Sequence, residues 1–290
     1  MEYIKNDYQQ TIMYIGRHTY HYHHGVHLNK PIKPFRGWRI GTELEVEFQD
    51  RDERTEFADS KSNWFYCESD GSIGSASSYG IEIITIPLLP KDAKDELFWA
   101  QLTDVLKTRA NAWDTDGRCG LHIHIGREIL GKTPEQHSET IGKLLYLYHH
   151  FVKDTRLNLK VFGRSMGYHE RDGKSNMGDA AKLLGGDTLK NKTVAEKVKK
   201  AMLDKSYNGC YDSTYRYFDI NLQNEHTIEF RKGRGTINPR RITGVIEYCE
   251  LLCLYAKITP WQQIDYNDFV SYLMATAKTP FMKDSVSMYR

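Results

Sequence analysis

Three segments of the sequence place ionisable side chains at every second position, between apolar residues. Alternate residues of a β-strand point to opposite faces, so each segment would present a charged face and an apolar face. The side chains expected to share the charged face are Glu43, Glu45, Glu47, His122, His124, Glu229 and Arg231. Carboxylates with one or two imidazoles and no thiolate are the ligands typical of a magnesium or manganese site. The spacing therefore predicts such a site on one face of a sheet.

A fourth segment, residues 81–86, also reads as a strand, but its glutamate lies on the same face as apolar side chains. Glu82 would share a face with Ile84 and Ile86. A carboxylate among β-branched neighbours is costly unless it is paired or bound to a metal. We therefore expect Glu82 to join the same site.

Arg231 offers a planar fork for phosphate or carboxylate oxygens. It opens a basic, glycine-containing loop, residues 231–236, that carries Lys232 and Arg234 and runs towards a helix expected to begin near Pro239. A helix N-terminus favours anions, so the loop is a candidate phosphate site, with a solvated basic turn as the alternative. Metal ligands beside such a loop suit phosphoryl transfer.

The elements that position these residues follow from hydrophobic periodicity and capping signals. Strands are expected at 38–48, 81–86, 119–126, 215–222 and 227–232. Helices are expected at about 91–110, from Pro134 behind a Thr133 cap, at 193–204, from Pro239 behind Asn238, and at 266–277. The first helix would bury Leu97, Phe98, Leu102, Val105 and Leu106, and a charged loop would cover 49–62. The predicted class is α+β, with a mainly antiparallel sheet that has a charged, metal-binding face and helices packed on the other side.

Several motifs occur in a fixed order from about residue 36 to residue 257. They are Gly41-Thr-Glu-Leu-Glu45, Asp70-Gly-Ser72, Gly80-Ile-Glu-Ile-Ile-Thr-Ile-Pro87, Cys119-Gly-Leu-His-Ile-His124, Gly163-Arg164-Ser165, Tyr217-Phe-Asp-Ile-Asn221-Leu and Thr227-Ile-Glu-Phe-Arg231-Lys-Gly-Arg-Gly-Thr236. This series resembles the amidoligase family of the glutamine synthetase-like carboxylate–amine ligases. The resemblance implies a glutamine synthetase-like fold and ATP-dependent activation of a carboxylate as an acyl phosphate, which an amine then attacks.

The resemblance also implies roles for individual residues. The implied ligands of two or more Mg²⁺ or Mn²⁺ ions are Glu43, Glu45, Glu82, His122 and Glu229, with Asp70 as a further candidate. Glu47 with Glu45, and His124 instead of His122, are alternative registers. Arg231 and Arg164 would contact phosphate or substrate beside Glu229, and Lys232, Arg234 and Asn221 would join Arg231 in binding ATP. The partners would be a carboxylate substrate and an amine donor that is an amino acid, a peptide or a protein.

Two other functions stay open at this point. His122, His124 and a glutamate would also suit a metal-dependent hydrolase or oxygenase that binds zinc, iron or manganese. A catalytically inactive relative would instead bind a nucleotide or a partner through the basic segments 190–205 and 231–241. The surplus of carboxylates favours the ligase.

Composition sets the remaining expectations. The 40 Lys and Arg residues nearly balance the 38 Asp and Glu residues, for a net charge of +2, which argues against a polybasic nucleic-acid binder. No stretch is apolar enough for a membrane helix, and the first residues carry no signal pattern. Five cysteines without a CxxC spacing argue against a disulfide framework and favour a cytoplasmic protein.

The domain organisation expected is a His-rich N-terminal segment, 1–35, followed by one catalytic domain, 36–290. The N-terminal segment holds five histidines between residues 18 and 27, and reads as a polar leader, a strand or a separate metal site. A Gly-rich insertion or lid is expected at about 163–187. Oligomeric state is left open by the sequence.

Overall fold

The computed structural model describes residues 37–60, 62, 64–68, 73, 79–112, 119–163, 219–222, 224 and 226–289. The expectations for the His-rich segment 1–35, for Asp70 and Arg164, for the Gly-rich segment beyond Gly163 and for the helix at 193–204 lie outside these residues. The expected strand at 215–222 is described only over its last four residues.

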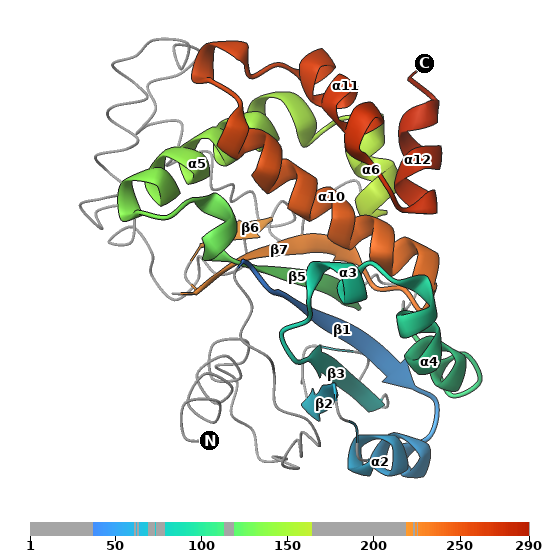
Figure 1. Cartoon of the computed structure of the whole chain (residues 1–290). Coiled ribbons are helices and arrows are strands. Elements are labelled where there is room, and N and C mark those ends of the chain that lie inside the picture. The colour runs from blue at the N-terminus through green and yellow to red at the C-terminus, as the bar shows by residue number, and fades with distance from the viewer. Residues whose placement is uncertain are drawn as a thin grey trace.

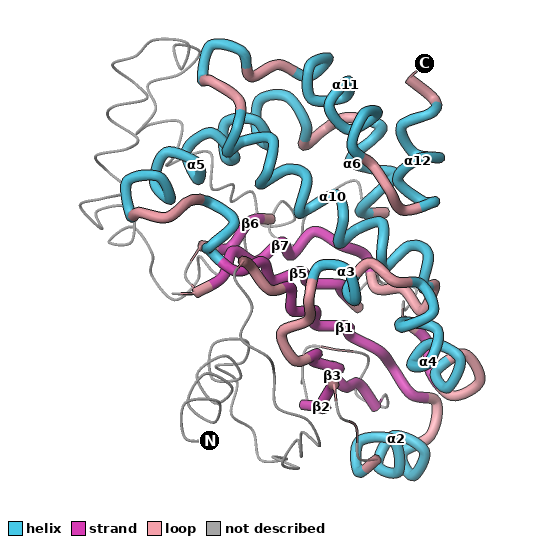
Figure 2. Tube along the Cα trace, viewed as in Figure 1, coloured by secondary structure: helices cyan, strands magenta, loops and turns pink. Residues whose placement is uncertain are grey.

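The described strands form one antiparallel sheet in the order β2-β3-β1-β5-β7-β6, and β4 pairs with β1. Their bounds are β1 Ile40–Phe48, β2 Phe65–Glu68, β3 Tyr79–Thr85, β4 Ala110–Asn111, β5 Gly120–Gly126, β6 Ile220–Asn221 and β7 Thr227–Arg234. Figure 2 shows the strands as adjacent magenta segments, with most helices above them and α2 below. The central strands β1, β5 and β7 are those with alternating charged residues, as the sequence predicted.

The helices lie mainly on one face of this sheet (Figure 1). They are α2 Arg51–Asp59, α3 Pro90–Ala93, α4 Glu96–Leu106, the 3₁₀ helix η1 Arg127–Leu130, α5 Pro134–Tyr146, the π-helix η2 Leu147–Val152, α6 Arg156–Phe162, α10 Pro239–Ile258, the 3₁₀ helix η5 Trp261–Gln263, α11 Tyr266–Thr276 and α12 Pro280–Ser287. The central helix α10 contacts β5 and also α4, α5, α6, α11 and α12. The α+β class with a mostly antiparallel sheet is therefore confirmed.

The hydrophobic core lies between the sheet and these helices. Leu44 and Val46 of β1, Ile123 of β5 and Phe230 of β7 are buried in this core, which also contains residues of α10. Each of these side chains occupies the apolar half of its strand's alternation, so the opposite half must face away from the helices. The fold thereby gathers the charged residues of three strands on one face.

The segment after β1 is a helix, which corrects the prediction of a charged loop at 49–62. Asp50 caps α2, because its Oδ1 accepts hydrogen bonds from the backbone N–H groups of Asp52 and Glu53 at 2.8 and 3.0 Å. Only Phe57 of this helix is buried. Hydrophobic periodicity could not predict this helix, because it has almost no apolar stripe. The capping residue Asp50 was the signal that the sequence offered.

The predicted helix at 91–110 is two helices, α3 and α4, which meet at Asp95. The Asp95 side chain accepts a hydrogen bond from the Leu97 N–H and so starts α4 there. Trp99 faces the core, whereas Leu97 is 78% exposed and Val105 is also exposed. The predicted stripe was therefore wrong at Leu97 and Val105, because the buried face of α4 consists of Trp99, Leu102, Thr103 and Leu106.

The other capping predictions agree with the structure. Thr133 and Asn238 cap α5 and α10 through their side-chain oxygens. Beyond α11, an additional helix, α12, begins at Pro280 behind a Thr279 cap. Among the described residues, no helix is both long and apolar enough to cross a membrane.

Candidate metal and nucleotide site

The charged face of the sheet is largely buried. Glu43 and Glu45 are each only 6% exposed, and His122, His124 and Glu229 are buried as well. Glu47, further along β1, is only partly buried. Buried carboxylates require opposite charges or hydrogen bonds, so their neighbours decide what this face does.

Strand register brings these residues opposite one another. Glu43 lies opposite His122 across β1 and β5, and His124 lies opposite Glu229 across β5 and β7. On the other side of β1, Glu45 lies opposite Glu82. Directly opposite residues in a sheet have Cβ atoms about 4.5–5.5 Å apart, so their side chains meet. Four adjacent strands thus contribute to one patch.

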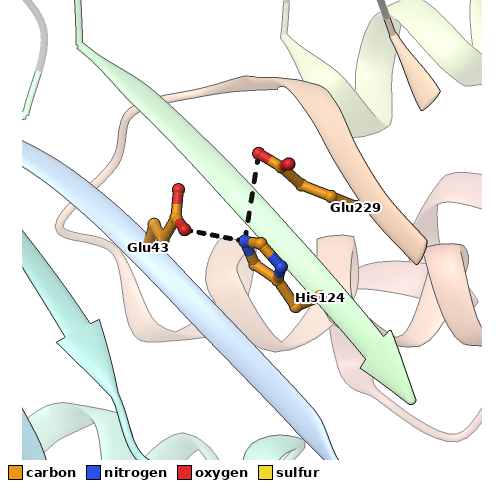
Figure 3. A group of neighbouring side chains, drawn as sticks. All are labelled: Glu43, His124 and Glu229. Carbon is orange, nitrogen blue, oxygen red and sulfur yellow. Dashed lines mark ion pairs between the residues drawn. The ribbon is translucent and has the colours of Figure 1, made fainter. Parts of the chain in front are cut away.

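Glu43, His124 and Glu229 form the first potential metal-binding group. The His124 Nε2 atom lies 2.8 Å from Glu43 Oε1 and 3.9 Å from Glu229 Oε1, as Figure 3 shows. On its other side, His124 Nδ1 lies 3.3 Å from Thr227 Oγ1. A hydroxyl on Nδ1 orients the imidazole and leaves Nε2 aimed at the two carboxylates, as for a metal-binding histidine.

Glu43, Glu82 and His122 form the second group. The other oxygen of Glu43, Oε2, lies 3.0 Å from His122 Nδ1, while His122 Nε2 lies 3.6 Å from Glu45 Oε1. Glu45 is further held by a hydrogen bond from the Gly120 N–H to its Oε2. Glu43 is therefore shared between the groups, with one carboxylate oxygen facing each histidine.

Three side chains hold the Glu229 carboxylate. Asn221 Nδ2 and Asn224 Nδ2 donate to its Oε2 at 2.6 and 3.2 Å, and the Arg231 guanidinium pairs with its Oε1. Oε1 is also the oxygen that faces the histidines. The two amides thus fix one oxygen, while the other points into the patch beside Arg231.

The charges on this face are set by their mutual proximity. Burial by itself would raise the pKa of Glu43, but His124 and His122 outweigh it and hold this pKa well below its usual range. The pKa of Glu229 is lowered too, because Arg231 and His124 outweigh its burial. Burial would lower the pKa of His124, but Glu43 and Glu229 raise it. Glu43 and Glu229 are therefore ionised and attract cations.

Glu68, at the end of β2, extends the patch and was missed by the sequence prediction. It lies opposite Glu82, and its buried Oε2 has no hydrogen-bond partner among the described residues. Burial, with the charge of Glu43, raises the pKa of Glu68 to about 7. Phe65 and Cys67 point to the core, so Tyr66 and Glu68 point to the opposite face. This alternation, over only four residues, was the sequence signal that could have placed Glu68 on the charged face.

Two of the predicted nucleotide contacts lie elsewhere. Lys232 is fully buried, with its Nζ 3.4 Å from Asp219 Oδ2 and 5.9 Å from the centroid of the Tyr148 ring, which belongs to the core. Arg234 lies near Gly163 and Arg241, at the end of α6. Asn221, in contrast, reaches the patch through Glu229.

The predicted basic loop at 231–236 is part of β7 as far as Arg234, and its glycines allow close packing. A Cβ atom at Gly233 would lie 2.3 Å from the Leu121 carbonyl oxygen, and one at Gly235 would lie 2.0 Å from that of Ala112. Such distances exclude any side chain at either position. At the end of the loop, Asn238 Oδ1 accepts hydrogen bonds from the first N–H groups of α10.

Carboxylate oxygens with one imidazole per group suit hard divalent cations, so the residues present fit Mg²⁺ or Mn²⁺. A family model described as "Putative amidoligase enzyme" matches residues 17–253, most of the chain. Neither the search of curated proteins nor the search of solved structures gave a match.

Proposed function

The chain belongs to the amidoligase family, whose name describes amide-bond-forming ligases, and from that premise we propose that it joins a carboxylate to an amine at the expense of ATP. The acid would be activated as an acyl phosphate with release of ADP. The amine would then displace phosphate and leave an amide or peptide bond. The amine donor would be an amino acid, a peptide or a protein.

The observation that carries this proposal is the position of Glu43 between two histidines. One oxygen of Glu43 faces His124 and the other faces His122, so each carboxylate oxygen serves a different group. A shared carboxylate is the natural bridge between two neighbouring cations. Two divalent ions held in this way would neutralise nucleotide phosphates during phosphoryl transfer.

The residues of the chain would divide the work as follows. Glu43, His124 and Glu229 would hold one ion, and Glu43, Glu82 and His122 the other, with Glu45 beside them. Arg231 would stabilise negative charge on the transferred phosphoryl group. Its pKa is raised because the charge of Glu229 outweighs burial, so it stays a cation at every physiological pH. Glu229 thus orients Arg231 as well as contributing a metal ligand.

The grouping of the histidines gives less support to a hydrolase or oxygenase. A single ion of that kind would use His122 and His124 together with one glutamate. In the part of the chain that the structure describes, each histidine instead belongs to a different group with two glutamates. Two oxygen-rich groups favour magnesium or manganese over zinc.

The test is release of ADP from ATP in the presence of Mg²⁺ or Mn²⁺, measured across a panel of carboxylates and amines. We expect release only when both an acid and an amine are supplied. Glu43→Gln should abolish it, because both groups lose their shared ligand. The control is Glu47→Gln, a partly buried glutamate on the same strand that belongs to neither group.

The outcomes separate the possibilities. Full activity in Glu43→Gln, or equal loss in Glu47→Gln, would contradict the assignment of the shared ligand. A wild-type protein that binds Mn²⁺ but neither binds nor turns over ATP with any pair would contradict the ligase. Stoichiometric zinc or iron with no nucleotide affinity would point to the hydrolase or oxygenase instead.

A further inference from the structure

Lys232 is a buried lysine that lies apart from the carboxylate patch. Its side chain is inaccessible to solvent, and its Nζ has no hydrogen-bond partner among the described residues. An ammonium group in such surroundings is costly unless an opposite charge compensates it. Asp219 supplies that charge at 3.4 Å, with the Tyr148 ring 5.9 Å away. A buried ion pair that is costly to form suggests a structural role for these two residues.

The pair lies at an irregularity of the sheet. Leu121 is opposite Gly233 and Ile123 is opposite Phe230, so two residues of β7, Arg231 and Lys232, face the single residue His122 of β5. This is the count of a β-bulge, a device that redirects side chains next to functional sites. At this bulge, Arg231 points to Glu229 while Lys232 points to the core residue Tyr148.

Asp219 connects the bulge to the neighbouring strand. Its backbone oxygen accepts a hydrogen bond from the Arg231 N–H at 2.8 Å, and its Oδ2 accepts one from the Tyr148 hydroxyl at 2.9 Å. Burial, with the charge of Asp219, raises the pKa of Tyr148 well above its usual value, so this hydroxyl stays a donor. Asp219 is thus fixed by three groups, two of them on β7.

Two residues further on, the same segment holds the Glu229 carboxylate. Asn221 and Asn224 both donate to Glu229 Oε2. These amides determine which way the carboxylate faces, and their own positions depend on β6, a strand of only two residues. Because β6 has few hydrogen bonds to its neighbouring strand, contacts of the preceding residue Asp219 would determine where β6 lies.

We propose that Lys232 and Asp219, with Tyr148, form a buried anchor that positions Asn221 and Asn224 and thereby aims Glu229 into the metal-binding patch. The anchor acts from the helix side of the sheet. Lys232 is accordingly a positioning residue that does not contact the nucleotide, in place of the role the sequence suggested. This inference rests on the metal site proposed above and extends it by the three residues of the anchor, Lys232, Asp219 and Tyr148.

The test uses a double variant, Asp219→Asn with Lys232→Met, which removes both charges and leaves neither one unpaired. Replacement of a buried ion pair by uncharged residues is often neutral for stability. We expect a folded protein with Mn²⁺ affinity reduced about 10-fold at one site, at the low end for loss of support behind a ligand. Calorimetric Mn²⁺ titration measures this without any turnover.

A second measurement needs no metal. In the double variant, amide hydrogen exchange at Arg231 should become faster. Without the ion pair, the backbone oxygen of residue 219 would be less firmly positioned to accept a hydrogen bond from the Arg231 N–H. Tyr148→Phe, which removes one hydrogen bond to Asp219 and keeps the ring, should shift both readouts in the same direction but less. It also keeps the question decidable if the double variant does not fold.

The matched control is Lys94→Met with Glu250→Gln. Lys94 and Glu250, the latter on α10, form another lysine–carboxylate pair, and Glu250 also accepts a hydrogen bond from Trp38 Nε1. This variant should bind Mn²⁺ like the wild type. The anchor is refuted if the Asp219/Lys232 variant keeps wild-type Mn²⁺ affinity and Arg231 exchange, or if the control weakens Mn²⁺ binding equally. If the wild type binds no Mn²⁺, the metal site itself fails, and exchange at Arg231 still decides the anchor.

Discussion

The raised pKa of Glu68 predicts that this residue lowers the stability of the protein at neutral pH. Between pH 4.5 and about pH 7 the folded protein keeps a Glu68 proton that the unfolded chain has lost. The free energy of unfolding therefore falls as pH rises through this window. Below pH 4.5 both states are protonated and there is no penalty. Glu68→Gln removes the titrating group, so the variant should be more stable than the wild type above pH 7.

The size of the effect follows from the same shift. Moving a pKa from 4.5 to about 7 corresponds to at most about 3.5 kcal/mol, at about 1.4 kcal/mol for each tenfold change in proton affinity. Glu68 is only partly buried, and solvent screens its charge, which reduces the expected gain to about 1–2 kcal/mol. The burial term is the larger cause, and the charge of Glu43 is the smaller one.

Urea unfolding in EDTA at about pH 4 and about pH 8 measures the difference. We expect Glu68→Gln and the wild type to be equally stable at the lower pH and to differ by about 1–2 kcal/mol at the higher one. Glu47→Gln removes another glutamate from the same face and measures the general effect of less negative charge there. If the gain at pH 8 is absent, or no larger than for Glu47→Gln, the assignment of Glu68 to a buried, electronegative position is wrong.

Three further predictions concern other parts of the molecule. Glu229→Gln should leave one bound Mn²⁺ where the wild type binds two, because Glu229 belongs only to the group with Glu43 and His124. Mn²⁺ titration followed by electron paramagnetic resonance counts the bound ions. Two bound ions in the variant would contradict the grouping. Asp50→Ala should lower the free energy of unfolding in urea by about 1 kcal/mol, because two backbone N–H groups at the start of α2 lose their acceptor. An unchanged free energy of unfolding would mean that α2 does not depend on this cap. Cys249 should not react with a thiol reagent until the protein unfolds, because burial raises its pKa well above its usual value. Rapid labelling of Cys249 in the native protein would contradict the packing of α10.

Most of the patch could be predicted from the sequence because β-strand alternation has a fixed period. The alternation of glutamates with Leu44 and Val46, and of histidines with Ile123, already separates a charged face from a core face. Which carboxylate meets which imidazole could not be predicted in this way. That depends on cross-strand register, which places Glu43 opposite His122. The shared role of Glu43 therefore emerges only in three dimensions.

Glu68 and Asn224 escaped prediction for a related reason. Neither lies in a long alternating segment, since β2 has only four residues and Asn224 follows a two-residue strand. Glu68 reaches the patch because it is opposite Glu82, and Asn224 because the chain turns back towards Glu229. Short segments give little periodicity, so pairing with longer neighbours determines their role.

Lys232 shows how the face of a strand on which a residue lies alters its functional assignment. Read as part of a basic, glycine-containing loop, it looked like a phosphate contact beside Arg231. In β7, as in any strand, consecutive residues point to opposite faces, so Arg231 points towards Glu229 and Lys232 towards Tyr148. The alternation of Glu229 with Phe230 was the available signal, whereas the extra residue opposite His122 could not be predicted because it depends on pairing with β5. The same basic dipeptide therefore serves the charged face with its arginine and supports that face from behind with its lysine.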